Sequence, residues 1–312
     1  MVKILPSTDS FQSQSQTPDC AFKVRYSKAD KSRLFIPEQY TQLYHCDAYS
    51  LLSEQQKIRY NQLFAARTNE QFMLFESGFT KCVMESLLRA GVFNNVDSIS
   101  DSLIILLKDE ERHFEMFRRL NQHCLPELYV SEHYLFLKIP KLERTLLELF
   151  CRYPHHIHAL VWLVLLMEEH AVRFSRDVIQ NTDSSDLGSL ENNFVNAHKA
   201  HLKDEARHVH IDADVLDYLL TQSTPRKSAI NSWLLKIILQ QTLKPKQAGL
   251  NVIKRLVVEF PELSNISKQL INAVRSFKYD PCMMPMFADR NLTPVSKALL
   301  DLHPDFEKAL VF

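Results

Sequence analysis

Apolar residues recur at helical spacing along most of this chain. Four large ones fall on one helix face within residues 53–90, a stretch without proline: Phe72, Phe75, Phe79 and Val83. Gly91 follows at the position where such a helix would end. Prolines and polar loops, such as residues 181–188, separate the later periodic stretches. The pattern predicts helices at residues 53–90, 98–123, 155–180, 190–221, 228–243, 245–258 and 262–277.

The longest apolar run is too short to cross a bilayer. It extends from Ala159 to Met167 and is ended by two adjacent carboxylates, Glu168 and Glu169. A membrane-spanning helix needs about 20 apolar residues. We therefore expect a buried helix at this place and no membrane association.

Composition supports a helical core. The 312 residues include only four glycines, fewer than the tight turns of sheets and phosphate-binding loops usually need, and 46% of the residues are hydrophobic. Residues 1–32 are polar and irregular, begin without the apolar core of a signal peptide, and read as a loosely attached leader. Residues 33–312 are predicted to form a single all-α domain with a four-helix core at about 53–221 and additional C-terminal helices.

Charge and cysteine usage narrow the classes of partner. Lys plus Arg and Asp plus Glu number 37 each, so no net charge favours nucleic acid or an anionic membrane. The six cysteines form no Cys-x-x-Cys pair and read as reduced thiols. These features predict a cytoplasmic protein that does not bind nucleic acid.

A five-residue pattern, Asp-Glu-x-Arg-His, occurs twice on predicted helices. Its copies are Asp109-Glu110-Glu111-Arg112-His113 and Asp204-Glu205-Ala206-Arg207-His208. Residues three apart share a helix face, so each Glu and His can bind the same ion. Two such helices, with one Glu from each of two others, build the dinuclear carboxylate site of ferritin-like bundles. The pattern predicts a ferritin-like four-helix bundle with two metal ions; carboxylate-rich ligation suits iron or manganese.

The two further carboxylates are sought on the other predicted helices. Glu76 lies on the apolar face of the first one, where an unpaired carboxylate would be costly. Glu70 and Glu85 point to other faces and are expected to be solvated. On the third helix periodicity favours Glu168, which shares its face with apolar residues, and Glu169 remains the alternative.

The second motif carries extra polar residues on its ligand face. His201 precedes Glu205 by four residues and is a candidate third imidazole ligand. His198 and Asp212 share this face and are candidates to contact the ligands. Within the motifs, the Asp residues are expected to orient ligating histidines and the Arg residues to balance charge. These supporting candidates are Asp109, Arg112, Asp204 and Arg207.

The doubled motif resembles the ferritin-like di-iron superfamily. His201 and the string Glu205-Ala206-Arg207-His208-Val209 are similar to a narrower group, the p-aminobenzoate N-oxygenase (AurF-like) family, over about residues 50–220. The resemblance implies a di-iron oxygenase that uses O₂ through a peroxo-diferric species to oxidise an amine nitrogen. It implies these ligands: Glu76, Glu110, His113, Glu168, His201, Glu205 and His208.

Three functions remain open at this point. The first is N-oxygenation of an aryl amine or amino acid, either free or tethered to a carrier protein, with an external electron donor. The second is hydroxylation or desaturation at carbon, and the third is a non-catalytic metal-bearing protein. Manganese in place of one or both irons stays an alternative, and a homodimer is the commonest assembly for such proteins.

Overall fold

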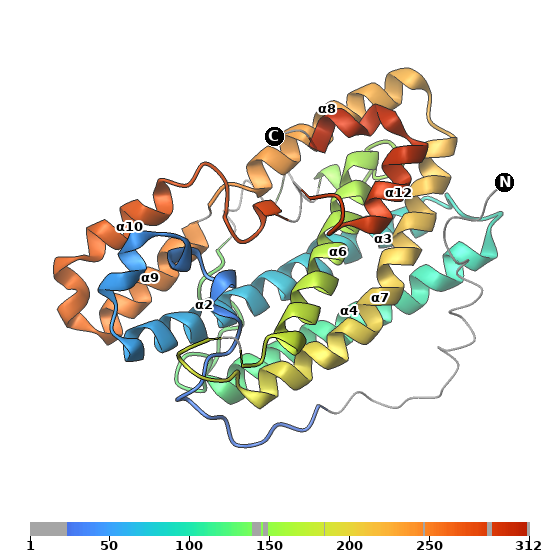
Figure 1. The fold of residues 1–312 in the computed structure, drawn as a ribbon. Helices are drawn as coiled ribbons and strands as arrows, with labels where there is room; N and C mark the ends of the chain where they lie inside the picture. Colours follow the sequence, from blue (N-terminus) through green and yellow to red (C-terminus); the bar gives the residue numbers. More distant parts are fainter. Residues whose placement is uncertain are drawn as a thin grey trace.

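Four long helices form the core of the chain. The computed structural model describes residues 24–138, 145, 149–183, 185–245, 247–285 and 289–310. The core helices, side by side in Figure 1, are α2 Glu54–Leu74, α4 Asp97–Cys124, α6 His158–Gln180 and α7 Asn192–Thr221. Helix α2 packs on α4, α4 on α7, and α7 on α6. No strand occurs among the described residues, and the predicted all-α, ferritin-like four-helix bundle is confirmed.

Local sequence signals explain where the core helices begin and end. Ser53 and Gln56 form a reciprocal capping box at the start of α2. Helix α3, Lys81–Arg89, is followed by Gly91, whose φ of 66° is a left-handed conformation that favours glycine. Helix α6 begins at His158 rather than at residue 155, because Pro154 starts a separate turn.

The predicted continuous helix over 53–90 is interrupted. Between α2 and α3 lies a π-helical segment, η4, which spans Phe75–Thr80. A π-turn widens the helix locally, and such turns are frequent at functional sites. The regular helical spacing assumed from the sequence was therefore wrong for this segment.

Additional helices follow the core, as predicted, but the predicted helix at residues 262–277 is divided into a short 3₁₀ turn and an α-helix, and a further α-helix lies beyond the predicted ones. The additional helices are α8 Pro225–Thr242, α9 Gln247–Glu259, α10 Ser267–Arg275 and α12 Pro294–Leu302. Helix α9 packs on α2, α8 on α6, and α12 on α6 and α7. Short helical turns complete the chain: η1 Glu38–Tyr40, η2 Gln42–His45, η3 Asp47–Leu51, η5 Pro261–Asn265 and η6 Pro304–Leu310. Of the predicted leader, residues 1–23 lie outside the described residues, and residues 24–32 contain no helix.

Two apolar clusters fill the bundle, one toward each end. On α2, η4 and α3 the first contains Phe79 and Val83 and the second Phe72. On α4 they contain Leu106 and Phe117 respectively. Helices α4, α6 and α7 thus cross from one cluster to the other, as does the continuous run of α2, η4 and α3. Buried polar side chains lie in the middle layer of the bundle, between the two clusters. No helix in the described part of the chain has the length and apolar character needed to cross a membrane.

Candidate metal centre

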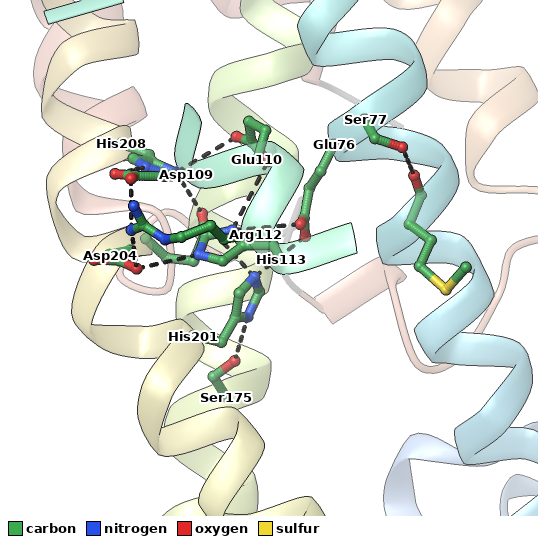
Figure 2. A network of polar contacts seen from close by, with 12 residues as sticks. Glu76, Ser77, Asp109, Glu110, Arg112, His113, Ser175, His201, Asp204 and His208 are labelled. Atoms are coloured by element: carbon green, nitrogen blue, oxygen red, sulfur yellow. Dashed lines mark hydrogen bonds and ion pairs between the residues drawn. The ribbon is translucent and has the colours of Figure 1, made fainter. Parts of the chain in front are cut away.

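All seven predicted ligands lie in this middle layer of the bundle. Each is at most 3% exposed, and the core helices together with η4 contribute them: Glu76 from η4, Glu110 and His113 from α4, Glu168 from α6, and His201, Glu205 and His208 from α7. Figure 2 shows Glu76, Glu110 and the three imidazoles converging. The structure thus brings together side chains that are up to 132 positions apart in the sequence, from Glu76 to His208.

The ligand atoms form groups of the size that a metal ion requires. Within each group these atoms lie within 4.8 Å of one another: Glu76, His113, His201 and Glu205; Glu110, His113 and His208; Glu168, Glu205 and His208. Glu205 Oε1 is 2.9 Å from both His113 Nδ1 and His201 Nε2, while Glu205 Oε2 is 3.5 Å from His208 Nδ1. Glu205 therefore belongs to both the first and the third group, which is the arrangement expected of a carboxylate shared by two ions.

The π-turn determines where Glu76 lies. Glu76 is the second residue of η4, and its two oxygens face His201 Nε2 at 3.2 Å and His113 Nδ1 at 3.5 Å. Ser77, the next residue, donates a hydrogen bond to the Met73 carbonyl oxygen at 2.6 Å (Figure 2). No side-chain pattern in the sequence signalled this local widening of the helix.

The two motifs brace each other's histidines. Asp204 Oδ2 of the second motif lies 3.3 Å from Nε2 of His113, and Asp109 Oδ2 of the first lies 3.3 Å from Nε2 of His208. Each imidazole thus turns its Nδ1 toward the carboxylate layer. We expected Asp to orient a ligating histidine, and the structure shows that each Asp contacts the histidine of the other copy (Figure 2).

Two arginines join the same network. Arg112 contacts Asp109 at 2.5 Å and Asp204 at 3.3 Å, and Arg207 contacts both of these carboxylates as well. Although burial alone would raise it, the hydrogen bond and charge of His113 hold the pKa of Asp204 at about 2. The pKa of Asp109 is likewise lowered, because His208 and the arginines outweigh the effect of burial. Both carboxylates are therefore ionised acceptors for the imidazole N–H groups at neutral pH.

His201 is supported differently. Its Nδ1 lies 3.1 Å from the Ser175 hydroxyl, which is also 3.1 Å from Nδ1 of His198. Thus His198, a supporting candidate, reaches His201 only through Ser175. Ser175 lies seven positions, or two helical turns, after Glu168, and it was not among the residues singled out from the sequence. Asp212, the other candidate on this face, is fully buried, and neither of its oxygens has a hydrogen-bond partner among the described residues.

Unpartnered buried atoms test whether this layer suits a metal. Among the described residues, both carboxylate oxygens of Glu110, Glu168 and Glu205 lack a hydrogen-bond partner, as do the Nδ1 atoms of His113 and His208. The 2.9 Å approach of His113 to Glu205 is an ion-pair distance without hydrogen-bond geometry. Buried polar groups are almost always paired. Oxygen and nitrogen atoms left unpartnered in one layer fit the donor set of a metal centre.

The electrostatics of the layer agree with this fit. Burial raises the pKa of Glu110 to about 7, and burial together with the charge of Glu205 raises that of Glu168 well above its usual value. Burial raises the pKa of Asp212 as well. By contrast, the pKa of Glu205 is lowered well below its usual value, because the charges of His201 and His208 outweigh burial. Cations in this layer would lower the raised carboxyl pKa values and keep the carboxylates ionised.

The adjacent pair on α6 divides between two places. Glu168 lies in the layer with Glu205 and His208, whereas Glu169 accepts hydrogen bonds from the backbone N–H groups of Val295 and Ser296. Glu169 thereby caps the first turn of α12. The sequence left Glu169 as the alternative ligand to Glu168, but Glu169 is buried outside the ligand groups, in the packing of α12 on α6.

The prediction that Glu70 is solvated was wrong, while Glu85 is partly exposed as expected. Glu70 is fully buried and accepts hydrogen bonds from the Tyr129 hydroxyl at 2.6 Å and from the backbone of Leu135 at 2.7 Å. The backbone N–H groups of residues 136 and 137 also donate to it. These donors come from a loop about 60 positions away, which helix periodicity could not reveal. Glu70 organises that loop and does not lie in the ligand layer.

Two openings approach the layer. A cavity of about 20 Å³ lies between α2 with η4 and α6, and both Glu76 and Glu168 line it. A groove of about 950 Å³ on the outer side of α4 and α7 has His113, Arg112 and Asp204 in its wall. The cavity is in contact with the predicted ligands Glu76 and Glu168. The groove is in contact with His113 and with the Arg112 and Asp204 side chains that support it.

Comparison with known protein families identifies a match. A family model described as P-aminobenzoate N-oxygenase AurF matches residues 23–278. Comparison with curated proteins and with solved structures found no match. The matched region contains all four core helices and every residue of the layer.

Proposed function

The chain belongs to the p-aminobenzoate N-oxygenase family, and from this premise we propose that it is a non-haem di-iron oxygenase acting on an amine nitrogen. The observation that carries the proposal is the buried layer of four glutamates and three histidines, whose inward atoms lack other partners within the described residues. The substrate is an aryl amine or amino acid, either free or tethered to a carrier.

The groups of ligand atoms suggest which residues would hold each ion. Glu76 and His201 would serve one position, and Glu168 and His208 the other. His113 would bind the ion nearer Glu76, because its Nδ1 lies closest to atoms that Glu205 and Glu76 present. Two carboxylates lie between the positions and would be shared: Glu110 and Glu205.

Bound iron would supply the activation of O₂, which no side chain of this chain can perform. Amine, O₂, two electrons and two protons give hydroxylamine and water, and a donor outside the chain supplies the electrons. The chain's own residues orient and shield the site. Asp109 and Asp204 hold two imidazoles with Nδ1 inward, and the apolar clusters on both sides exclude water.

The cavity between α2 and α6 is the candidate route by which an amine would reach the layer. Glu76 and Glu168 line it together with the apolar side chains of Phe72, Phe75 and Met167. A volume of about 20 Å³ holds roughly one water molecule, so side chains must move to admit a substrate. Gln71 also lines the cavity, and its amide nitrogen lies 3.9 Å from the sulfur of Met283. Displacement of these two flexible side chains would open the cavity.

The test compares two ligands that differ only at the reacting group. The protein is loaded with Fe(II) without oxygen and exposed to ¹⁸O₂ and a reductant, with either 4-aminobenzoate or 4-methylbenzoate. We expect one oxygen atom from O₂ in the amine product, detected by mass spectrometry, and an unchanged methyl compound. A Glu205→Gln variant, which alters the shared carboxylate, serves as the inactive control.

Each other outcome identifies a different function. Oxidation of the methyl compound with the amine intact would contradict N-oxygenation in favour of chemistry at carbon. Two bound irons per chain, with neither these nor a panel of amino acids oxidised, would favour a non-catalytic metal-bearing protein.

A further inference from the structure

Ser175 is the residue on which the state of His201 depends. His201 presents Nε2 to the carboxylate layer, at 2.9 Å from Glu205 Oε1 and 3.2 Å from Glu76 Oε1. For Nε2 to bind an ion it must carry a lone pair, so the imidazole proton must sit on Nδ1. Ser175 Oγ, 3.1 Å away, is the atom that accepts this proton in a hydrogen bond (Figure 2).

The direction of the next hydrogen bond follows. A serine hydroxyl has one hydrogen, and Ser175 Oγ also lies 3.1 Å from Nδ1 of His198. If the oxygen accepts from His201, its hydrogen is donated to His198. That bond requires His198 to be neutral with its proton on Nε2. Burial lowers the pKa of His198 well below its usual value, which agrees with the neutral form.

The surroundings of His198 offer its imidazole no other hydrogen-bond partner within the described residues. The imidazole is fully buried and is in ring contact with Phe72, Phe117 and Phe174. Its Nε2 has no hydrogen-bond partner in the described part of the chain. Ser175 thus provides its one hydrogen bond there, which favours a fixed orientation of the hydroxyl.

We infer that Ser175 is a positioning residue that selects the metal-binding tautomer of His201, with His198 as its acceptor. The inference rests on the proposed metal centre. On this inference the two metal positions differ in how their histidines are supported. His113 and His208 are each fixed by an ionised aspartate, whereas His201 depends on a neutral hydroxyl. Loss of that hydroxyl acts on the position shared by Glu76 and His201 and spares the position of Glu168 and His208.

The test is an equilibrium titration with Fe(II) alone, without oxygen or substrate. In Ser175→Ala we expect about a 10–100-fold loss of affinity at one position, the usual size of such a supporting contact, and a change of at most about threefold at the other. Ser102→Ala is the matched control, since Ser102 is also a buried core-helix serine but donates to the Ser98 carbonyl. It should leave both affinities unchanged.

A second variant separates positioning from a packing defect. His198→Leu removes the acceptor of the hydroxyl and should produce a smaller loss at the same position. The double variant with Ser175→Ala should be no worse than Ser175→Ala alone, because both act through one chain of hydrogen bonds. Independent packing defects would instead multiply their effects, which would overturn the inference.

A spectroscopic signature completes the test. Fe(II)-loaded wild type should show three shifted, exchangeable imidazole N–H signals, one for each ligating histidine. Ser175→Ala should alter only one of them. Wild type that binds two ions, with both affinities and all three signals kept in Ser175→Ala, would refute this inference and leave the proposed function intact. Wild type that binds fewer than two ions would contradict the proposed function itself.

Discussion

Replacing Asp204 by asparagine tests the bracing between the two motifs. The Asp204 side chain is 10% exposed and lies 3.3 Å from both His113 Nε2 and Arg112, and 3.4 Å from Arg207. Asparagine keeps the size and one acceptor oxygen but removes the charge. We expect two losses: stability of the metal-free protein, and metal affinity at the position that His113 serves.

The lowered pKa of Asp204 gives the size of the expected loss of stability in the metal-free protein. The pKa of Asp204 falls from 3.8 to about 2, which corresponds to about 2 kcal/mol in favour of the ionised carboxylate in the folded state. Because this pKa is depressed on folding, the stabilisation is present above pH 3.8 and is lost as the pH falls through about 2. With an unfolding entropy of about 2.1 cal/mol/K per residue, about 2 kcal/mol lowers the melting temperature of this 312-residue protein by roughly 3 °C.

The assay is thermal unfolding of the metal-free protein in chelator, followed by Fe(II) titration. The gap between wild type and Asp204→Asn should be constant from pH 8 to 5 and narrow below about pH 4. Iron affinity at one position should fall about 10–100-fold. Asp101→Asn, at an exposed site on α4, is the control. If Asp204→Asn behaves like this control in both assays, the bracing has no energetic role.

Three further predictions concern neighbouring carboxylates and pH. Glu168→Gln should lower the iron content below two per chain. Glu169→Gln should keep two irons and lower only the melting temperature, because Glu169 caps α12. The reverse pattern would show that Glu169, and not Glu168, is the ligand. Glu70→Gln should cost about 2 kcal/mol in denaturant unfolding by mismatching buried donors, with iron content unchanged. Burial raises the pKa of Glu110 to about 7. The pKa of His208 is raised to about 10, because Glu205 and Asp109 outweigh the effect of burial. Both groups must lose protons to bind iron, so affinity should rise between pH 6 and 10. Raised pKa values stabilise the folded state at low pH, so the metal-free protein should lose stability over this range; a flat profile in either assay would contradict the assignment.

Much of the fold and of the layer could be predicted because the signals are local. The doubled motif, the apolar face around Glu76 and the face of Glu168 depend on helical periodicity alone. The structure places all three in one layer, although the ligand roles themselves stay predictions. The positions of α8, α9 and α10 followed from the same reasoning, whereas α12 was not predicted.

The remaining features arise from tertiary contacts or from backbone geometry. Asp109 and Asp204 contact the histidine of the other motif, which depends on how α4 and α7 pack. Glu70 takes its partners from a distant loop, and the π-turn at Glu76 departs from regular spacing. Ser175 was on the right face, but its contacts required the position of α7 relative to α6.

The iron content of the protein is the most direct test of the proposed dinuclear centre. After anaerobic loading with Fe(II) and removal of loose metal, elemental analysis should give two irons per chain. Glu205→Ala, which removes the carboxylate common to two of the ligand groups, should bind fewer than two. One iron or none in the folded wild type, or two in Glu205→Ala, would contradict the assignment of this layer as a dinuclear centre.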